Sequence, residues 1–150
     1  RFERVGEAAG VEVIDDYAHN PEKVRAALAA ARLRAKRVLA VFQLHGFAPA
    51  RFLRNEFIES FAQSLNPGDV LWLPEIYYVG GTAAKDVSAK DYADALKARG
   101  CDARYAPDRR SIPKELAACA RPGDLALIMG ARDPSLSAFA TSILRALPLR

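Results

Sequence analysis

The chain has 150 residues, 51% of them hydrophobic, and a formal net charge of +4. This composition is typical of one globular domain with a continuous apolar core. Two cysteines, Cys101 and Cys119, do not provide the disulfide framework of a small secreted protein, so we expect a cytoplasmic protein. No apolar run approaches the roughly 20 residues of a membrane helix, and no signal-peptide pattern opens the chain, so we expect no membrane partner.

The basic residues are spread along the chain rather than clustered. A nucleic-acid surface usually combines a stripe of Lys and Arg with interleaved aromatic residues, and no such stripe is present. The positive charge therefore favours a small anionic partner, such as a nucleotide or a carboxylate. We expect no nucleic acid as a partner.

Strand and helix patterns alternate from the first residue to the last. The chain opens with a predicted hairpin, residues 1–16, which turns at Ala9-Gly10. The later strands are short apolar runs, and the helices carry apolar residues at helical spacing. In chain order we first predict a helix at 21–33, a strand at 37–42, a polar junction at 43–51 and a helix that buries Leu53, Phe57, Phe61 and Leu65. A strand at 69–73, a glycine-hinged loop at 76–81, a helix capped by Ser88 that closes at Gly100, and a strand at 102–106 are predicted next. The last elements are a helix along Ile112, Leu116 and Cys119, a strand at 124–129, and a final helix, opened by Asp133-Pro134, along Leu136, Phe139, Ile143 and Leu147.

This alternation predicts an α/β fold. We expect a doubly wound, mainly parallel, Rossmann-like sheet of about six strands, with one antiparallel edge strand and helices on both faces. No interdomain linker is visible, so residues 1–150 are expected to form a single domain. The junctions after the first, second and last buried strands would share the carboxyl edge of the sheet, where such folds bind ligands.

The segment Asp15-Asp16-Tyr17-Ala18-His19-Asn20-Pro21 joins an expected strand to the first helix. Asn20 has the properties of an N-cap and Pro21 those of a first helical residue. Free backbone N–H groups and the positive helix end meet at such a junction and favour ligand binding. The alternative is a capped helix whose two aspartates only stabilise its N-terminus. The density of polar side chains in this segment favours a ligand site.

The second histidine, His45, also follows a strand. Two histidines without a nearby cysteine or third histidine do not predict a metal site. The sequence contains no G-x-x-x-x-G-K-[ST] phosphate loop and no G-x-G-x-x-G dinucleotide motif. A polar edge that lacks a phosphate loop indicates half of a site, with the other half on another domain.

The segment 15–21, preceded by Arg1-Phe2-Glu3 and followed by the run 41–45, Val-Phe-Gln-Leu-His, resembles the C-terminal domain of the Mur ligases, most closely those that add alanine. The related folylpolyglutamate synthetases share the Ala-His-Asn-Pro core, and the resemblance covers essentially the whole chain. It implies an ATP-dependent ligase of peptidoglycan precursor synthesis or recycling, in which an amino acid or peptide attacks an acyl phosphate on a UDP-linked muramyl substrate. ATP and Mg would be held mainly by a central ATPase domain. That domain and the N-terminal UDP-binding domain lie outside this chain, so the isolated domain is expected to be inactive.

The resemblance also implies nucleotide contacts. Arg1 matches an arginine that reaches the ATP phosphates, and Asp16 and His19 match positions that hold the ribose. Asp15 and Asn20 adjoin them and are counted with the nucleotide contacts. A carboxylate accepts hydrogen bonds from ribose hydroxyls, and a neutral imidazole can donate or accept. No catalytic residue is assigned to this domain.

The implied substrate contacts are Tyr17, His45, Arg51, Arg132 and Ser135. In the alanine-adding members the second junction typically reads Phe-Gln-Pro-His-Arg, and here Gly46 replaces that arginine. The amino acid's carboxylate then needs another partner, for which Arg51 is the first choice and Arg132 the second. If Arg51 does not bind the carboxylate, we expect it to lie along the helix surface and pair with Glu56 or with solvent. The departure leaves open which amino acid is added.

One alternative of a different class is open at this stage. A stand-alone nucleotide or small-anion binding module, with no catalysis, would show the same polar edge. Such a module would bind ATP measurably as an isolated domain, whereas half of a site would bind it poorly.

Overall fold

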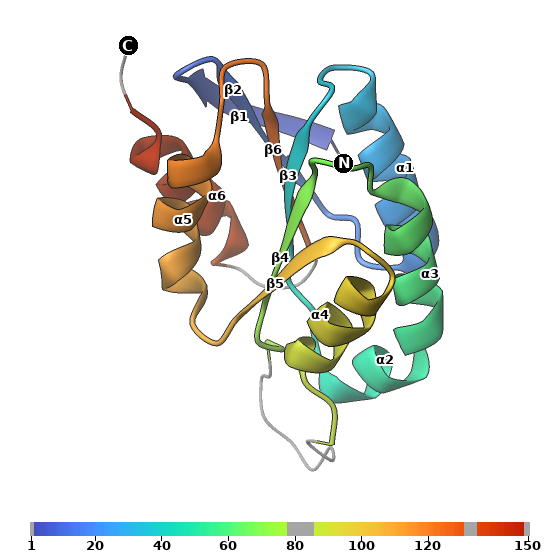
Figure 1. The fold of residues 1–150 in the computed structure, drawn as a ribbon. Coiled ribbons are helices and arrows are strands. Elements are labelled where there is room, and N and C mark those ends of the chain that lie inside the picture. Colours follow the sequence, from blue (N-terminus) through green and yellow to red (C-terminus); the bar gives the residue numbers. More distant parts are fainter. Residues whose placement is uncertain (1, 78–85, 131–134, 149–150) are drawn as a thin grey trace.

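A six-stranded sheet runs through the middle of the molecule, with helices on both sides (Figure 1). The computed structural model describes residues 2–77, 86–130 and 135–148. In these ranges no helix combines the length and the apolar character needed to cross a lipid bilayer. Arg1, Arg132, the opening Asp133-Pro134 of the last helix and most of the expected 76–81 loop lie outside the described residues.

The order of the strands in the sheet is β1-β2-β6-β3-β4-β5. β1 pairs antiparallel with β2, and the other neighbouring strands are parallel. The strands are β1 (Phe2–Ala8), β2 (Val11–Asp16), β3 (Val38–Phe42), β4 (Val70–Pro74), β5 (Asp102–Ala106) and β6 (Leu125–Met129). The predicted mainly parallel α/β sheet with one antiparallel edge strand is confirmed.

The helices are α1 (Pro21–Arg32), α2 (Phe47–Phe52), α3 (Arg54–Ser64), α4 (Ala89–Ala98), α5 (Ile112–Cys119) and α6 (Leu136–Ala146), with a 3₁₀ turn at Arg109–Ser111. Asn20 caps α1 as predicted, because its side-chain oxygen accepts a hydrogen bond from Lys23 N. Ser88 caps α4 in a reciprocal capping box with Asp91.

The sequence prediction was wrong for residues 47–51, which were assigned to a polar junction. Together with Phe52 they form the short helix α2, in which Phe47 and Ala50 are buried one turn apart. Pro49 is tolerated because it lies in the first turn, where its missing N–H has no helical partner. Leu53 separates α2 from α3, and it is only partly buried instead of belonging to the core.

Alternating residues of the buried strands supply two apolar layers. Ala40, Leu71 and Leu127 face the layer that contains α1, α3 and α4, whereas Leu39, Trp72 and Ile128 face α5 and α6. Both faces of the central strands are therefore buried, which explains their continuous apolar runs. The carboxyl ends of the strands lie on the lower side of Figure 1, between these layers.

Candidate functional site

The ends of β2, β6 and β3 meet at the carboxyl edge. In the strand register Asp16 and Phe42 both align with Met129, so the junctions after these three strands begin side by side. This confirms the predicted shared edge. Glycine at position 130 permits the chain after β6 to lie close to the chain after β3. A Cβ atom there would lie 2.9 Å from the Gln43 carbonyl oxygen, and the φ of Gly130 is +138°.

The first junction holds its side chains by short-range hydrogen bonds. Asp16 is buried, and its Oδ1 accepts from Ala18 N at 2.9 Å. His19 Nδ1 lies 2.9 Å from the Tyr17 carbonyl oxygen. A carbonyl only accepts, so this bond requires the proton on Nδ1 and leaves Nε2 of the neutral ring as an acceptor. Asn20 uses its side-chain oxygen to cap α1, so only its amide N–H groups are suited to a ligand.

Asp15 and Asp16 point to opposite faces of the sheet, because side chains alternate along a strand. Asp16 lies on the α1 side, in a depression of about 350 Å³ that Tyr17 and His19 also line. Asp15 lies on the α6 side, where Ser137 Oγ donates to its Oδ2 at 3.4 Å. Burial raises the pKa of Asp15, and its Oδ1 has no hydrogen-bond partner among the described residues. The structure therefore does not bring Asp15 together with Asp16 and His19.

The second junction brings His45 beside His19. Both line a cavity of about 170 Å³ whose other walls are mainly apolar, including Phe42, Pro49 and Phe57. A short parallel β-bridge to Tyr77 fixes the backbone of His45, and the rings of His45 and Tyr77 stack with centroids 5.3 Å apart. The Nδ1 atom of His45 is buried and has no hydrogen-bond partner among the described residues.

Of the two arginines predicted for the substrate carboxylate, Arg51 does not line this cavity, and Arg132 lies outside the described residues. Arg51 Nη1 donates to Asp86 Oδ1 at 2.6 Å, so its partner is Asp86 instead of Glu56. The guanidinium also lies 5.7 Å from the ring centroid of the exposed Phe52. Gly46 has φ +81°, a region that an arginine at this position would enter only with strain.

Two further side chains were missed by the sequence reasoning. Arg109, after β5, donates to Ser135 Oγ and to Gln43 Oε1, the latter at 3.2 Å. Glu75, after β4, accepts from Ala89 N and Tyr105 Oη at 3.0 and 2.7 Å. Both residues follow strands at the same edge of the sheet, which was the available signal.

Glu75 is ionised more readily than an ordinary glutamate. Burial opposes its ionisation, but hydrogen bonds from Ala89 N, Tyr105, Ile76 N and Ser88 together hold its pKa below the usual 4.5. The carboxylate thereby joins β4, β5 and the N-terminus of α4 beneath the edge. These hydrogen bonds hold the carboxyl end of β4 in place at the edge of the candidate site.

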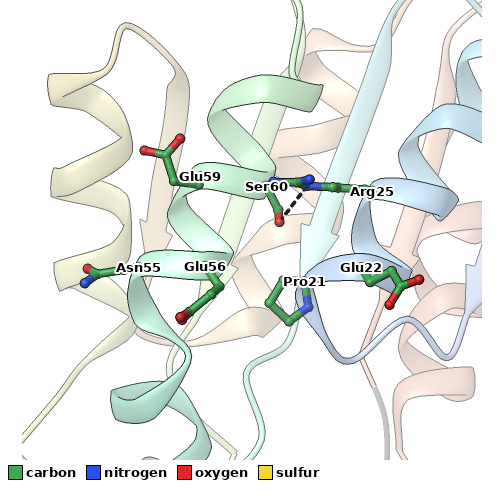
Figure 2. Close-up of a pocket in the computed structure, with 7 residues that line it drawn as sticks. All are labelled: Pro21, Glu22, Arg25, Asn55, Glu56, Glu59 and Ser60. Atoms are coloured by element: carbon green, nitrogen blue, oxygen red, sulfur yellow. Dashed lines mark hydrogen bonds between the residues drawn. The ribbon is translucent and has the colours of Figure 1, made fainter.

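A separate cleft of about 480 Å³ lies between α1 and α3 (Figure 2). Arg25 reaches across from α1 and donates to Ser60 Oγ of α3 at 3.0 Å. The described lining includes Glu22, Glu56 and Glu59 but no residue predicted for the site. This cleft is a groove between two helices, and the Arg25–Ser60 bond ties those helices together.

The arrangement can bind a small polar ligand, with hydrogen-bonding groups at the edge and an apolar cavity beside them. Within residues 2–77, 86–130 and 135–148, no group of three His, Cys, Asp or Glu side chains is placed to hold a metal ion. The hydrogen-bonding side chains at this edge suit the hydroxyl and carboxylate groups of a ligand. The fold and this edge together define an open α/β domain with its ligand groups at the ends of parallel strands.

Comparisons with known proteins agree with this class. The sequence profile described as Mur ligase, glutamate ligase domain, matches residues 1–132. UDP-N-acetylmuramate–L-alanine ligase of Gloeobacter violaceus is 41% identical over 131 residues, which are 87% of this chain and 28% of that protein. The crystal structure of UDP-N-acetylmuramate-alanine ligase from Thermotoga maritima is similar with a TM-score of 0.66 at 24% identity, over 91% of this chain and 26% of that one. E. coli FolC in complex with ADP is similar with a TM-score of 0.61 at 18% identity, over 94% and 29% of the two chains.

The chain belongs to the Mur ligase family, as its C-terminal, glutamate ligase domain. The two solved structures establish the likeness of the fold. The chain spans 28% of the length of the Gloeobacter relative.

Proposed function

We propose that this chain is the C-terminal domain of a cytoplasmic, ATP-dependent amino-acid ligase of peptidoglycan precursor synthesis or recycling. The family match supports the ligase class, and the name of the Gloeobacter relative supports a UDP-linked muramyl substrate. The partner within the same protein is a central ATPase domain that lies outside this chain. The observation that carries the role of this domain is the meeting of Asp16, His19 and His45 at one edge of the sheet.

The nucleotide half of the site is the first junction. Asp16 supplies a carboxylate that can accept from ribose hydroxyls, and the Nε2 atom of His19 can accept from a second hydroxyl. The family resemblance assigns contacts with the ATP phosphates to Arg1, which lies outside the described residues. Asp15 does not share the role, because its side chain lies on the opposite face of the sheet.

ATP phosphates and Mg are held by the central domain. The described residues of this chain offer no carboxylate cluster for the metal, and the sequence has no phosphate loop. This domain binds the ribose, excludes water and orients the incoming amine. The C–N bond forms as the amine attacks the carbonyl carbon of the acyl phosphate, and the C–O bond to phosphate breaks.

The amino acid lies between the two junctions. The cavity of about 170 Å³ beside His45 offers apolar walls for a side chain, and Tyr17 and Ser135 flank the edge from β2 and α6. A small amino acid or the first residue of a peptide matches the size of this cavity. The UDP-linked substrate approaches from the other domains.

The test is the pair Asp16→Ala and His19→Ala in the complete ligase. Each variant loses hydrogen bonds to the nucleotide, so we expect kcat/KM for ATP to fall about 10-fold or more in each. His19 is exposed, so its variant keeps the wild-type melting temperature. Glu22→Gln, in the first turn of α1 and outside the site, is the matched control and keeps wild-type kinetics. Unchanged ATP kinetics in both site variants would refute the ribose role.

A further inference from the structure

The helix α2 forms one wall of the cavity beside His45. Pro49 and Ala50 line the cavity from this helix. Phe42 and Phe57 line it from β3 and α3. Ala50 is 1% exposed, so a larger side chain at this position would have to take its space from the cavity or from the core. The size of residue 50 and the position of α2 therefore limit the room for a ligand.

Tyr92 of α4 holds this wall in position. The carbonyl oxygens in the last turn of a helix have no hydrogen-bond partner within that helix. Tyr92 Oη donates to the carbonyl oxygen of Ala50 at 2.5 Å. Tyr92 is fully buried, and this burial raises the pKa of its hydroxyl, which therefore stays protonated as a donor. The ring of Tyr92 also lies 6.2 Å, centroid to centroid, from the ring of Phe57, so one side chain supports two walls of the cavity.

The volume of the cavity is close to that of one small amino acid. An apolar cavity of roughly 150 Å³ accommodates benzene, a molecule of about six non-hydrogen atoms. The cavity beside His45 has a volume of about 170 Å³. Alanine has the same number of non-hydrogen atoms as benzene. One carbon atom added to the ligand, or to the wall, is therefore a substantial part of the available room.

We propose that Ala50 determines the largest amino acid that this cavity admits, and that Tyr92 is a positioning residue that holds Ala50 in place. This inference rests on the proposed function, which assigns the cavity to the incoming amino acid. A single methylene group gained or lost in an apolar pocket changes kcat/KM by about 10-fold or more. The hydrogen bond from Tyr92 restrains α2 from moving back to make room for a larger substrate.

The experiment measures kcat/KM of the complete ligase for glycine, L-alanine and L-2-aminobutyrate, whose side chains grow by one carbon atom at each step. In Ala50→Gly we expect the ratio of kcat/KM for L-2-aminobutyrate to that for L-alanine to rise about 10-fold, because the wall loses its methyl group. In Ala50→Val we expect the ratio for L-alanine to that for glycine to fall about 10-fold, because the added carbon atoms occupy the space of the substrate's methyl group.

Tyr92→Phe removes only the hydroxyl group and keeps the buried ring. The wall then loses its hydrogen bond at Ala50, and we expect the ratio for L-2-aminobutyrate to that for L-alanine to rise about 3- to 10-fold. A loss of stability alone would lower kcat/KM for all three amines by the same factor. The ratios therefore separate a positioning role from a purely structural one, and wild-type ratios in Tyr92→Phe would overturn the positioning role.

Ala31→Gly and Ala31→Val are the matched controls. Ala31 is also a fully buried alanine of a helix, but it lies in the last turn of α1. The next residue, Arg32, pairs with Asp69 just before β4, so this turn lies at the opposite edge of the sheet from the cavity. Both controls keep the wild-type ratios. Wild-type ratios in the Ala50 variants, or an equal loss with all three amines, would overturn the inference.

The two proposals fail in different ways. If the wild-type complete ligase shows no ATP-dependent turnover with any of the three amines, the proposed function in its small-amino-acid form is wrong, and the assignment of Ala50 is lost with it. If the wild type is active and the ratios do not change in the Ala50 variants, only the assignment of Ala50 is wrong. The melting temperature of each variant shows whether it is folded. If Ala50→Val does not fold, the ratios in Ala50→Gly and Tyr92→Phe decide the question.

Discussion

At the scale of single residues, local geometry decides which polar groups serve the edge. Asp15 and Asp16 are neighbours in sequence, yet strand alternation places one beside α6 and the other beside α1. His19 and His45 are 26 positions apart in the numbering, yet they line one cavity because parallel strands end together. The position of a residue relative to a strand end therefore predicted which side chains come together better than adjacency in the sequence did.

Restoring the family arginine at position 46 is expected to fail. Gly46 has φ +81°, and a Cβ atom there would lie 3.3 Å from Cδ of Pro49. We expect Gly46→Arg to lower the free energy of unfolding by about 1–3 kcal/mol, because a non-glycine residue is strained in this backbone. Urea denaturation of residues 1–150 measures the change. Gly100→Arg also has a positive φ, +86°, but meets no neighbouring atom, so it reports the backbone strain alone. A variant at position 46 as stable as the wild type would contradict this explanation.

The side chains found by sequence reasoning and those missed differ in the range of their contacts. Asp16, His19 and Asn20 belong to one strand-to-helix segment, whose capping and turn chemistry is local and therefore readable. Arg109 reaches Gln43 over 66 positions and Ser135 over 26. Such contacts depend on the order of strands in the sheet, which hydrophobic periodicity alone does not specify. Glu56 was the wrong partner to expect for Arg51 for the same reason, since the partner in the structure, Asp86, is 35 positions away.

At the scale of elements, two Pro-Gly-Asp turns organise the opposite, amino edge of the sheet. Asp69 precedes β4 and accepts from Asn66 N, and Asp124 precedes β6 and accepts from Arg121 N, each bond being 2.8 Å. Arg32 pairs with the first aspartate and Arg37 with the second. The same turn therefore precedes both strands that flank β3. The amino edge of the sheet is held by these structural contacts, and the proposed ligand site is at the carboxyl edge.

Removing Asp69 is expected to destabilise the domain strongly. Its side chain is 1% exposed, and it also accepts from Val38 N at 2.9 Å, so Asp69→Ala leaves Arg32 and two N–H groups without this acceptor. We expect a loss of about 3 kcal/mol in the free energy of unfolding. Asp94→Ala breaks only the exposed ion pair with Lys90 and should lower the free energy of unfolding far less than Asp69→Ala does. Equal losses in the two variants by urea denaturation would contradict the structural role of the turn.

Glu75 is expected to make the stability of the domain depend on pH in the acid range. Its pKa in the folded protein lies below the ordinary 4.5, so the carboxylate form favours folding. This contribution is complete above pH 4.5 and is lost as the pH falls through the lowered pKa of the folded state. We expect Glu75→Gln to be less stable than the wild type at pH 7, and the difference to narrow below pH 4.5. Urea midpoints measured from pH 7 to pH 3 test this, and a constant difference would exclude Glu75 as the source.

At the scale of the whole molecule, the sheet could be predicted but the helical boundaries near the site could not. Buried parallel strands have a continuous apolar pattern, and their alternation with helices restricts the topology, so the antiparallel edge and the shared carboxyl edge were confirmed. The helix α2 was missed because it has only six residues and contains Pro49. Its helical state depends on packing of Phe47 and Ala50 against the core, which no local pattern reveals.

The domain should fold alone yet bind nucleotide poorly. Two apolar layers are complete within these residues, so we expect residues 1–150 to unfold in one cooperative transition. A half-site without a phosphate loop provides only part of the contacts to ATP, so calorimetry should detect no tight ATP binding. Measurable, saturable ATP binding by the isolated domain would instead favour a stand-alone nucleotide-binding module.

The most direct test of the proposed ligase function is ADP release that depends on the amino acid. The complete ligase, the same protein without residues 1–150, and residues 1–150 alone are each assayed with ATP, Mg and UDP-N-acetylmuramate, with L-alanine present or left out. We predict that only the complete ligase releases ADP in response to L-alanine, because the proposed function assigns the phosphate loop and the amino-acid contacts to different domains. Ligase turnover by residues 1–150 alone, or an undiminished response to L-alanine in the protein that lacks them, would contradict it.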